Sequence, residues 1–518
     1  MKVKRWIWML LATITGYIGL LVLLTVAEQA NPESSIQSFT DALWYSIVTL
    51  STVGYGDLYP VTLVGKWIGV IFVLLSVGAL AFLVGAVVQL FTGQMLPRLQ
   101  LRLLRGKQWY LFSEMNDMTL ALAQSLKALG GVVLFPVEDR EKAAKEESFA
   151  YYPGAMEQIV AGKGSGCTLF YMAADGETNY ERALSAMALG HPIHCCTEQV
   201  LDACPENLHL FDGYACCARD YWNRHPLCAG EENVILIGSG RYARELLEQG
   251  LCVNVFDPNR RVRYHLFGDW MDFRRNHPCL GDVLQVDQDG EEDSLFFHTD
   301  AWNADGALLC NAQRIVLCGD DAGENMQILR QLRRYFPVSG KVHLRARQAV
   351  PGETVFGTDD QVYTMENVLL AKLTWMARCM HGIYLENAPQ GTPDWRQLSE
   401  FTRQSNMAAA DHLPVKVRLL LEDETILTPT AQQMQSAYER FAQESRRDLY
   451  RQIEHRRWMR FHGLHNWRYG PVRNNGARIH PMMQPFKDLS EAEQAKDDYA
   501  WQLLAKMAQE MERILEDN

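Results

Sequence analysis

The segment Leu50–Pro60, LSTVGYGDLYP, places two glycines and an aspartate between two long apolar runs. Residues 6–27 contain no charged side chain, and residues 64–91 contain only Lys66. Because an apolar helix of ~20 residues crosses the ~30 Å hydrocarbon core of a bilayer, both runs are predicted membrane spans. A secretory signal peptide is the alternative for the first run, but it would leave the second span without a helix to pack against.

Charged residues around the two runs predict their orientation. The loop 28–65 contains four acidic residues and no Lys or Arg. The basic residues that flank the runs are Lys2, Lys4, Arg5, Arg98, Arg102 and Arg105. The positive-inside rule therefore predicts a multi-pass protein of the cell (inner) membrane with both termini in the cytoplasm. The acidic loop would lie outside, where it concentrates cations.

The loop is predicted to contain a short helix followed by an ion-binding segment. Residues 39–50 are apolar and aromatic, with Thr40 as the expected N-cap and Asp41 at the positive helix start. A dehydrated cation needs a ring of oxygens, and backbone carbonyls supply it when successive residues alternate between right- and left-handed conformations. Glycine reaches the left-handed region without steric cost, which explains Gly54 and Gly56.

These residues define a predicted selectivity filter. One chain cannot surround an ion, so four copies around an axis are expected. Tyr55 is expected to face away from the axis and to pack against Trp44 and Tyr45. The predicted filter residues are Thr52, Val53, Gly54, Tyr55, Gly56 and Asp57, the last at the mouth.

Residues 39–65 closely resemble the pore region of the two-transmembrane potassium channels, whose signature TVGYG lies between a pore helix and a second span. The resemblance implies a homotetramer embedded in membrane lipid and selective for K⁺. The permeant ion would be held at Thr52, Val53, Gly54 and Tyr55. The inner helix would run from Val64 to about Gln94, with Gly78 and Gly85 as candidate gating hinges. The alternative for both glycines is close packing between membrane helices.

A second motif lies in residues 234–259, VILIGSGRYARELLEQGLCVNVFDPN. A buried strand, a G-x-G-x-x-A turn, a helix and a second strand at 253–256 are typical of a dinucleotide-binding fold. Gly238 would make the tight turn, and Gly240 would admit a phosphate at the helix N-terminus. Ala243 would pack the helix on the strand, and Asp257 would hold a ribose hydroxyl. The predicted ligand is an adenine nucleotide or a dinucleotide, and the alternative is a fold that has kept its form but no longer binds a nucleotide.

Internal similarity indicates that this domain occurs twice, because the stretches that begin at Thr168 and Arg314 share strand, acidic turn, helix and strand. The first copy begins near Gln108, and its turn Ser113–Asp117 lacks the glycines and holds acids that would repel a phosphate. Tandem Rossmann-like domains behind a two-span pore resemble the domains that regulate conductance of potassium (RCK), over residues 108–347. The resemblance implies a ring of such domains that responds to a cytosolic small-molecule ligand; adenine nucleotides and metal ions serve in that family.

The twelve cysteines include two adjacent pairs and no C-x-x-C motif. Free thiols buried in a reducing compartment are therefore expected. The alternative is a metal site formed by His191, His194, Cys195, Cys196 and Cys204.

The C-terminal segment 430–515 resembles the ryanodine-receptor repeat domain, a small helical module, through the order W-x-Y-G-x-x-R and a later His-Pro. The candidate ligand-pocket residues are Trp467, Tyr469, Arg473 and His480. They could stack a base and bind an anion, and the alternative is that the aromatics are the core of the module. Asn474 and Asn475 stand where the family carries an acidic pair. The three arginines of 456–460 are expected on a solvated face.

These patterns predict a multidomain chain, and 518 residues leave room for several domains of ~150 residues. It comprises an α-helical two-span membrane pore domain with a re-entrant pore loop, two α/β Rossmann-like domains and a small α-helical C-terminal domain. The predicted boundaries are 1–96 for the pore, 97–107 for the linker, 108–230 and 231–350 for the Rossmann-like domains, 351–428 for a helical connector and 429–518 for the C-terminal domain.

The predicted function is a ligand-gated, K⁺-selective channel rather than an enzyme. The alternative is a membrane-anchored, nucleotide-dependent oxidoreductase or effector, for which the sequence offers no convincing catalytic pair and no reason for TVGYG. A homotetramer and a cytosolic small-molecule ligand are the expected partners, and no nucleic acid is expected.

Overall fold

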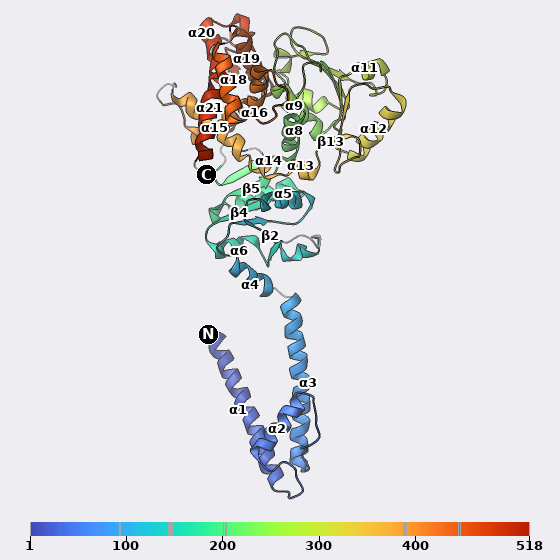
Figure 1. Ribbon diagram of the computed structural model, residues 1–518, viewed down its shortest axis with the longest axis vertical. Coiled ribbons are helices and arrows are strands. Elements are labelled where there is room, and N and C mark those ends of the chain that lie inside the picture. The colour runs from blue at the N-terminus through green and yellow to red at the C-terminus, as the bar shows by residue number, and fades with distance from the viewer. Residues whose placement is uncertain are drawn as a thin grey trace. The chain divides into compact units, whose positions relative to one another are not determined.

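The structure is a computed structural model that describes residues 2–92, 95–142, 149–199, 201, 205–386, 391–443, 445 and 447–516. The chain divides into two compact units, Met1–Arg102 and Leu103–Asn518, and Figure 1 labels many of their elements. The predicted end of the inner helix at Gln94 lies outside the described residues.

The first unit is a helical hairpin with a third helix between its arms (Figure 1). Its helices are α1 (Lys2–Gln29), α2 (Phe39–Leu50) and α3 (Leu63–Thr92). A small apolar core joins them through residues such as Leu24, Ala42 and Phe72. In the described part of the chain, Leu63–Phe82 is long and apolar enough by composition to cross a membrane, with a mean hydropathy of 2.2, and Ile14–Gln29 is a shorter apolar stretch.

The N-cap of helix α2 lies two residues earlier than predicted. Ser38, not Thr40, is its N-cap: the Asp41 backbone N–H donates to Ser38 Oγ at 3.2 Å. The Asp41 carboxylate in turn accepts from the Ser38 backbone N–H at 2.8 Å. This reciprocal capping box satisfies two otherwise unpaired donors, which a cap at Thr40 would leave open.

The second unit contains two parallel, doubly wound sheets. The first sheet has the order β3-β2-β1-β4-β5-β6. Its elements are β1 (Trp109–Phe112), α5 (Asp117–Lys127), β2 (Val132–Pro136), β3 (Ala150–Tyr152), α6 (Met156–Lys163), β4 (Cys167–Tyr171), α7 (Gly176–Ala186), β5 (Ile193–Cys196), β6 (Leu208–Phe211) and α8 (Gly213–Arg224). This strand order, which reverses at β1, is the order of the Rossmann fold predicted for the first domain.

The second sheet has the order β13-β12-β11-β7-β8-β10-β9. Its elements are β7 (Asn233–Ile237), α9 (Arg241–Val253), β8 (Arg263–Phe267), α10 (Met271–Asn276), β9 (Gln285–Val286), β10 (Ser294–His298), α11 (Gly306–Asn311), β11 (Arg314–Leu317), α12 (Ala322–Tyr335), β12 (Lys341–Arg345) and β13 (Thr354–Phe356). Helices cover both faces, because Val234 and Leu236 share a core with α9 whereas Ile235 and Ile237 share one with α11 and α12.

The predicted second strand at 253–256 is wrong. Helix α9 continues to Val253, and the strand that follows it, β8, begins only at Arg263. The apolar residues Leu251, Cys252 and Val253 are buried on α9. A short apolar run does not distinguish a buried helix end from a strand, so tertiary burial decided the assignment.

The Rossmann-like domains are joined by helix packing and by the chain segment after β13. Helices α8 and α9 pack together, and Trp222 Nε1 donates to the Leu246 carbonyl at 2.7 Å. After β13 the chain returns to the first domain through α13 (Asp359–Val362) and α14 (Met365–Leu369), where the Met365 backbone N–H donates to Ser125 Oγ at 2.8 Å. The second sheet therefore extends past residue 350, the predicted boundary.

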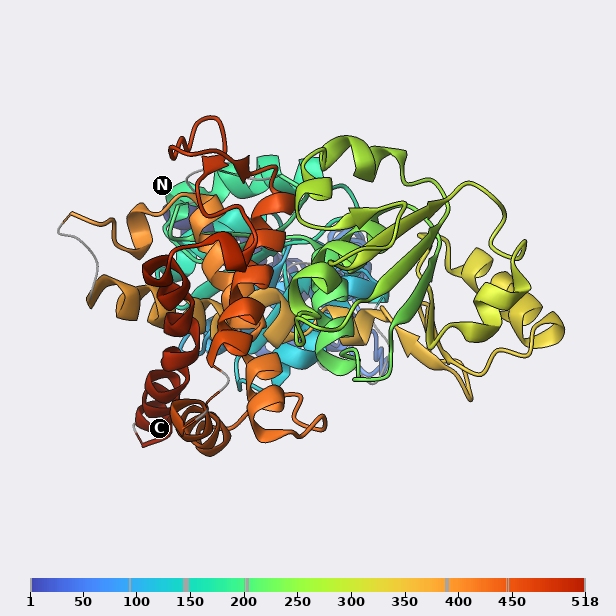
Figure 2. The same ribbon diagram turned by 90° about the horizontal axis from the view of Figure 1, so that it is seen from above.

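The helices that follow α14 form one body that lies beside the second sheet (Figure 2). They are α15 (Ala371–Glu386), α16 (Glu400–Asp411), α17 (Leu413–Leu421), α18 (Ala431–Gln443), α19 (Arg447–Leu464), α20 (Glu491–Gln494) and α21 (Tyr499–Glu516). One apolar core contains Met376 of α15, Val417 of α17, Phe441 of α18 and Trp501 of α21. The segment predicted as a connector thus supplies helices to the same core as the C-terminal segment.

Arginines of α19 attach this body to the second sheet. Arg460 is 1% exposed, and its Nη1 lies 2.8 Å from Asp293 Oδ2. Arg456 Nε also lies 2.9 Å from Glu292 Oε2 of the second domain. Arg457 is 2% exposed and donates to Glu454, three residues earlier on α19 itself, at 2.7 Å. The expectation that these arginines lie on a solvated face is therefore wrong, because nearby carboxylates compensate their charge.

Candidate functional site

The pore loop follows α2 directly, and its backbone alternates in handedness. Thr52, Gly54 and Gly56 have φ values of 63°, 59° and 73°, and the residues between them do not share this left-handed conformation. The backbone N–H groups of Val53 and Gly54 both donate to the Val48 carbonyl, at 3.1 and 3.2 Å. This is the alternation on which the predicted ring of carbonyls depends.

Thr52 is a filter feature that the sequence did not reveal. A β-branched residue in the left-handed region is an outlier, with a cost of about 1–3 kcal/mol. Strain of this kind persists where surrounding contacts enforce it, and it gathers at functional sites. The glycines were recognisable as left-handed from sequence, whereas the threonine gave no such signal.

Trp44 on α2 supports the loop in two ways. Its ring stacks on Tyr55 with a centroid distance of 6.2 Å and an interplanar angle of 3°. Its Nε1 donates to Asp57 Oδ2 at 2.9 Å, and this hydrogen bond lowers the pKa of Asp57. The predicted contact of Tyr55 with Trp44 is present, whereas Tyr45 instead packs against Phe72 of α3.

Glu28 at the end of α1 is a second feature that the sequence did not reveal. The sequence pattern assigns Glu28 to the acidic loop, but in the structure its side chain is fully buried. Its carboxylate accepts from Ser34 Oγ at 2.6 Å, from the Val61 backbone N–H at 3.0 Å and from the Thr62 backbone N–H at 3.1 Å. One carboxylate thereby fixes the segment that leads from the filter into α3.

The candidate hinges Gly78 and Gly85 lie within the continuous helix α3. Among the described residues, a Cβ added at either glycine would meet nothing within 4 Å apart from the adjacent helix backbone. The choice between a hinge and a helix-packing site stays a prediction.

The G-x-G-x-x-A turn has the predicted local form. Gly238 and Gly240 have φ values of 130° and 102°, which favour glycine, and Ala243 is fully buried where α9 meets the sheet. A Cβ on Gly238 would lie 2.3 Å from the Gly319 backbone nitrogen. The backbone N–H groups of Arg241 and Tyr242, at the start of α9, donate hydrogen bonds to the carboxylate of Asp320.

Asp257 does not lie at the end of the sheet where the glycine turn is found. It lies in the loop before β8, at the amino end of that strand, and accepts from the Asn259 backbone N–H at 2.8 Å. Dinucleotide folds hold the ribose at the carboxyl ends of their strands. The prediction from sequence put Asp257 at the carboxyl end of the second strand because it assigned that strand to residues 253–256.

The corresponding turn of the first domain is closed by its own side chains. Asn116 caps α5 by accepting from the Thr119 backbone N–H at 2.9 Å, and it donates to Glu114 at 2.9 Å. The Met115 backbone N–H donates to Asp139 Oδ2 at 2.8 Å. Acidic groups therefore occupy this turn, in keeping with the expectation that it disfavours a phosphate.

The four candidate pocket residues of the C-terminal segment separate into two pairs. Trp467 is 5% exposed and stacks on Phe401 at 5.4 Å, and His480 is 9% exposed, where burial lowers its pKa to about 4. Tyr469 is 54% exposed, and Arg473 Nε donates to Asn475 Oδ1 at 2.8 Å on the surface. Trp467 and His480 thus belong to an aromatic core, as the alternative predicted.

The proposed metal ligands do not assemble in the described part of the chain, where no group of three or more suitable side chains is present. His194 instead stacks between Phe170 and His209 at 5.2 and 4.9 Å, and burial lowers its pKa to about 3. Cys204 lies outside the described residues.

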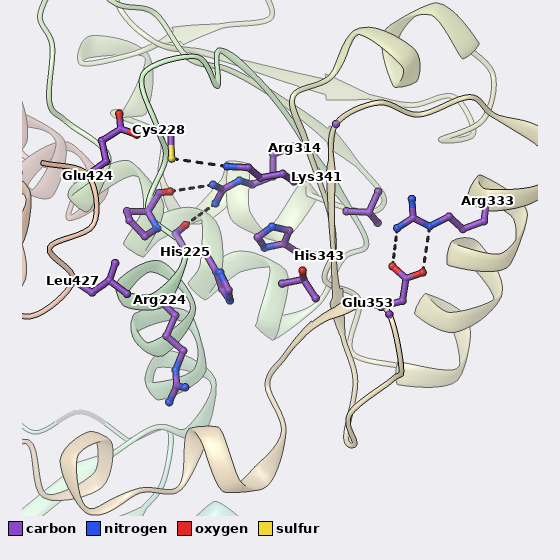
Figure 3. Close-up of a pocket in the computed structure, with 15 residues that line it drawn as sticks. Arg224, His225, Cys228, Arg314, Arg333, Lys341, His343, Glu353, Glu424 and Leu427 are labelled. Carbon is purple, nitrogen blue, oxygen red and sulfur yellow. Dashed lines mark hydrogen bonds and ion pairs between the residues drawn. The ribbon is translucent and has the colours of Figure 1, made fainter.

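A cavity of about 480 Å³ opens at the amino ends of β11, β12 and β13 (Figure 3). Its cations are paired: Arg314 donates to Glu231 at 2.7 Å, and Arg333 donates to Glu353 at 2.7 Å. Lys341 Nζ lies 3.4 Å from Glu231. The cavity lies at the edge opposite the glycine turn, and the pairing leaves little net charge for an anion.

Residues 6–93 match the family model described as an ion channel. The chain is 47% identical over 66 residues to a voltage-gated potassium channel of Aeropyrum pernix and 40% identical over 65 residues to human potassium voltage-gated channel subfamily A member 4. The matches cover 13% and 12% of this chain and 22% and 10% of those proteins. These relatives are described as channels rather than enzymes.

Among solved structures, the chain is similar to the GsuK channel, with a TM-score of 0.41 and 14% identity over 70% of this chain and 97% of that one. A structure of GsuK bound to ADP gives a TM-score of 0.41 and 13% identity over the same shares. A structure of that channel bound to NAD gives 0.38 and 12%, over 71% and 84%.

Proposed function

We propose that the chain is the subunit of a K⁺-selective channel in the cell membrane, in which four copies place their pore loops around one axis. The observation that carries this proposal is the alternation of left-handed residues at Thr52, Gly54 and Gly56 directly behind a helix whose carboxyl end points into the loop. The ion-channel family model that matches residues 6–93 and the similarity to potassium channels support it.

Flux through reconstituted liposomes tests the proposal. We expect an outward K⁺ gradient to drive K⁺ efflux, and an equal Na⁺ gradient to drive far less, because a rigid ring of carbonyls replaces the hydration shell of the larger ion. Particle size in detergent should correspond to four chains. Equal fluxes of the two ions, or a monomeric particle that conducts, would contradict the proposal.

We further propose that the second unit is a sensor that gates the pore through a cytosolic ligand. Its two doubly wound sheets, joined by the packing of α8 on α9, resemble a fold that binds nucleotides. A ligand can gate the pore only if it binds the open and closed arrangements with different affinity. The ryanodine-receptor-type segment, with Tyr469 and Arg473 exposed, is a second place where a ligand could act.

Replacing Trp44 with phenylalanine is expected to make conduction more sensitive to acid. Phenylalanine keeps the stack on Tyr55 but removes the indole donor that lowers the pKa of Asp57. Because a lowered pKa keeps the carboxylate charged to lower pH, its loss moves the midpoint of acid inhibition of K⁺ flux to higher pH. Trp67→Phe, on the exposed face of α3, is the control. An unchanged midpoint would show that Asp57 does not govern the response.

A further inference from the structure

Asp320 occupies the amino end of α9, directly above the glycine turn. Its Oδ2 accepts from the Arg241 backbone N–H at 3.1 Å, and its Oδ1 accepts from the Tyr242 backbone N–H at 3.1 Å. These two donors begin the helix that follows the G-x-G-x-x-A motif. They are the groups that a dinucleotide fold offers to a pyrophosphate, together with the positive end of the helix dipole.

The position of Asp320 follows from the sheet rather than from a flexible surface contact. Strands β7 and β11 are neighbours, and the turns after them approach so closely that a Cβ on Gly238 would lie 2.6 Å from the Gly319 Cα. Arg345, which is 5% exposed, donates to the Asp320 carbonyl at 2.7 Å and lies over the Tyr242 ring at 3.9 Å. The backbone that carries Asp320 is thus held on both sides.

The position of the Asp320 carboxylate also explains why residue 240 is a glycine. A Cβ at this position would lie 2.2 Å from Asp320 Oδ2. The motif requires a glycine there so that an anion can approach the helix end, and in this chain the approaching anion is an aspartate of the chain itself. The Arg241 side chain is also committed, since it pairs with Asp212 at 2.7 Å and with Glu198 of the first domain.

We infer that Asp320 is an internal occupant of the phosphate position and closes the second Rossmann-like domain to nucleoside diphosphates. An incoming diphosphate would compete for two N–H groups that already have a charged acceptor, and it would meet a like charge. A nucleotide enters only when Asp320 leaves. The physiological consequence rests on the proposed gating function: this domain responds to a nucleotide only through a displaced Asp320.

Calorimetric titration of the detergent-solubilised full chain with ADP tests the inference. Asp320→Ala frees both N–H groups and removes the charge, so we expect ADP to bind more tightly than to the wild type by on the order of tenfold, the factor that one charge-assisted hydrogen bond represents. Asp320→Asn keeps a neutral acceptor and should fall between the two. Adenosine, which lacks phosphates, should show no difference among the three proteins.

Asp321→Ala is the matched control. Asp321 caps α12 by accepting from the Gly323 backbone N–H at 2.7 Å, so this variant loses a carboxylate helix cap at the adjacent position without opening the glycine turn. It should bind ADP like the wild type. At equal concentration, ADP should also raise the melting temperature of Asp320→Ala more than that of Asp321→Ala, because stabilisation by a ligand that binds only the folded state grows with its affinity.

Two outcomes would overturn the inference. In the first, wild type and Asp320→Ala bind ADP equally well, which would show that Asp320 does not exclude it. In the second, neither protein binds ADP, which would show that something other than Asp320 closes the domain. Calorimetry does not depend on conduction, so a failure here leaves the K⁺ flux results intact, and a failure of K⁺ selectivity leaves this inference intact.

Discussion

Replacing Gly54 with alanine is expected to abolish K⁺ flux while the tetramer still assembles. Gly54 has a φ of 59° in the middle of the pore loop. An alanine there pays about 1–2 kcal/mol to stay left-handed, and a fourfold pore would contain four such residues. The backbone can relieve this cost by turning the Gly54 peptide, which removes its carbonyl from the ring that replaces the ion's water. Gly56→Ala, at a φ of 73°, should behave in the same way.

Liposome flux and size-exclusion chromatography measure the two parts of this prediction. Gly16→Ala in α1 is the control, because it adds the same methyl group to the same unit where nothing lies within 4 Å and the backbone is helical. A Cβ on Gly54 also meets nothing within 4 Å of its own chain. Any difference between the variants therefore reports backbone conformation or neighbouring subunits. Normal K⁺ flux through Gly54→Ala would refute the filter assignment.

Replacing Glu28 with alanine is expected to produce the largest loss of stability in the first unit. The substitution leaves the Val61 and Thr62 backbone N–H groups without their acceptor. A buried donor that loses its partner costs about 1–3 kcal/mol, and bonds to a charged acceptor are at the upper end of such values. We therefore expect a drop of several degrees in the melting temperature in detergent and a reduced K⁺ flux, since the segment behind the filter loses its anchor.

Glu33→Ala provides the comparison, because Glu33 is an exposed acid of the same loop. If the acidic loop acts only by concentrating cations, both variants should reduce flux slightly and leave the melting temperature unchanged. If Glu28 is the structural anchor, only its variant loses stability, and Glu28→Gln, which retains an acceptor of the same shape, recovers part of it. Equal melting temperatures for Glu28→Ala and Glu33→Ala would contradict the anchoring role.

Two segments show which signals in the sequence predicted the secondary structure correctly. Residues 39–50 were predicted as a helix, and α2 covers them. The G-x-G-x-x-A motif predicted a strand, a turn and a helix, and β7 and α9 flank the turn. Both predictions rested on signals within a few residues: glycines that must be left-handed, and apolar residues at the period of one secondary structure.

The errors arose where burial by distant residues made the decision. The strand expected at 253–256 belongs in part to α9, so Asp257 precedes the amino end of β8 instead of following the carboxyl end of a strand beside the glycine turn. Trp467 and His480 looked like a ligand pocket, but Phe401, some sixty residues earlier, covers Trp467. No local pattern distinguishes an aromatic that stacks on a ligand from one that stacks on its own core.

The amino-acid sequence alone determined the two apolar runs, the left-handed glycines of the pore loop and the doubly wound character of the two α/β domains, because each depends on local conformational preference or on periodic burial. The tertiary structure alone decided that Glu28 is buried against the segment between the filter and α3 and that Asp320 lies on the end of α9. Glu28 binds residues 33 and 34 positions away, and Asp320 meets its donors 79 and 78 positions away. The identity of a carboxylate's partner is set by which strands and helices become neighbours, and charge and spacing in the sequence do not contain that information.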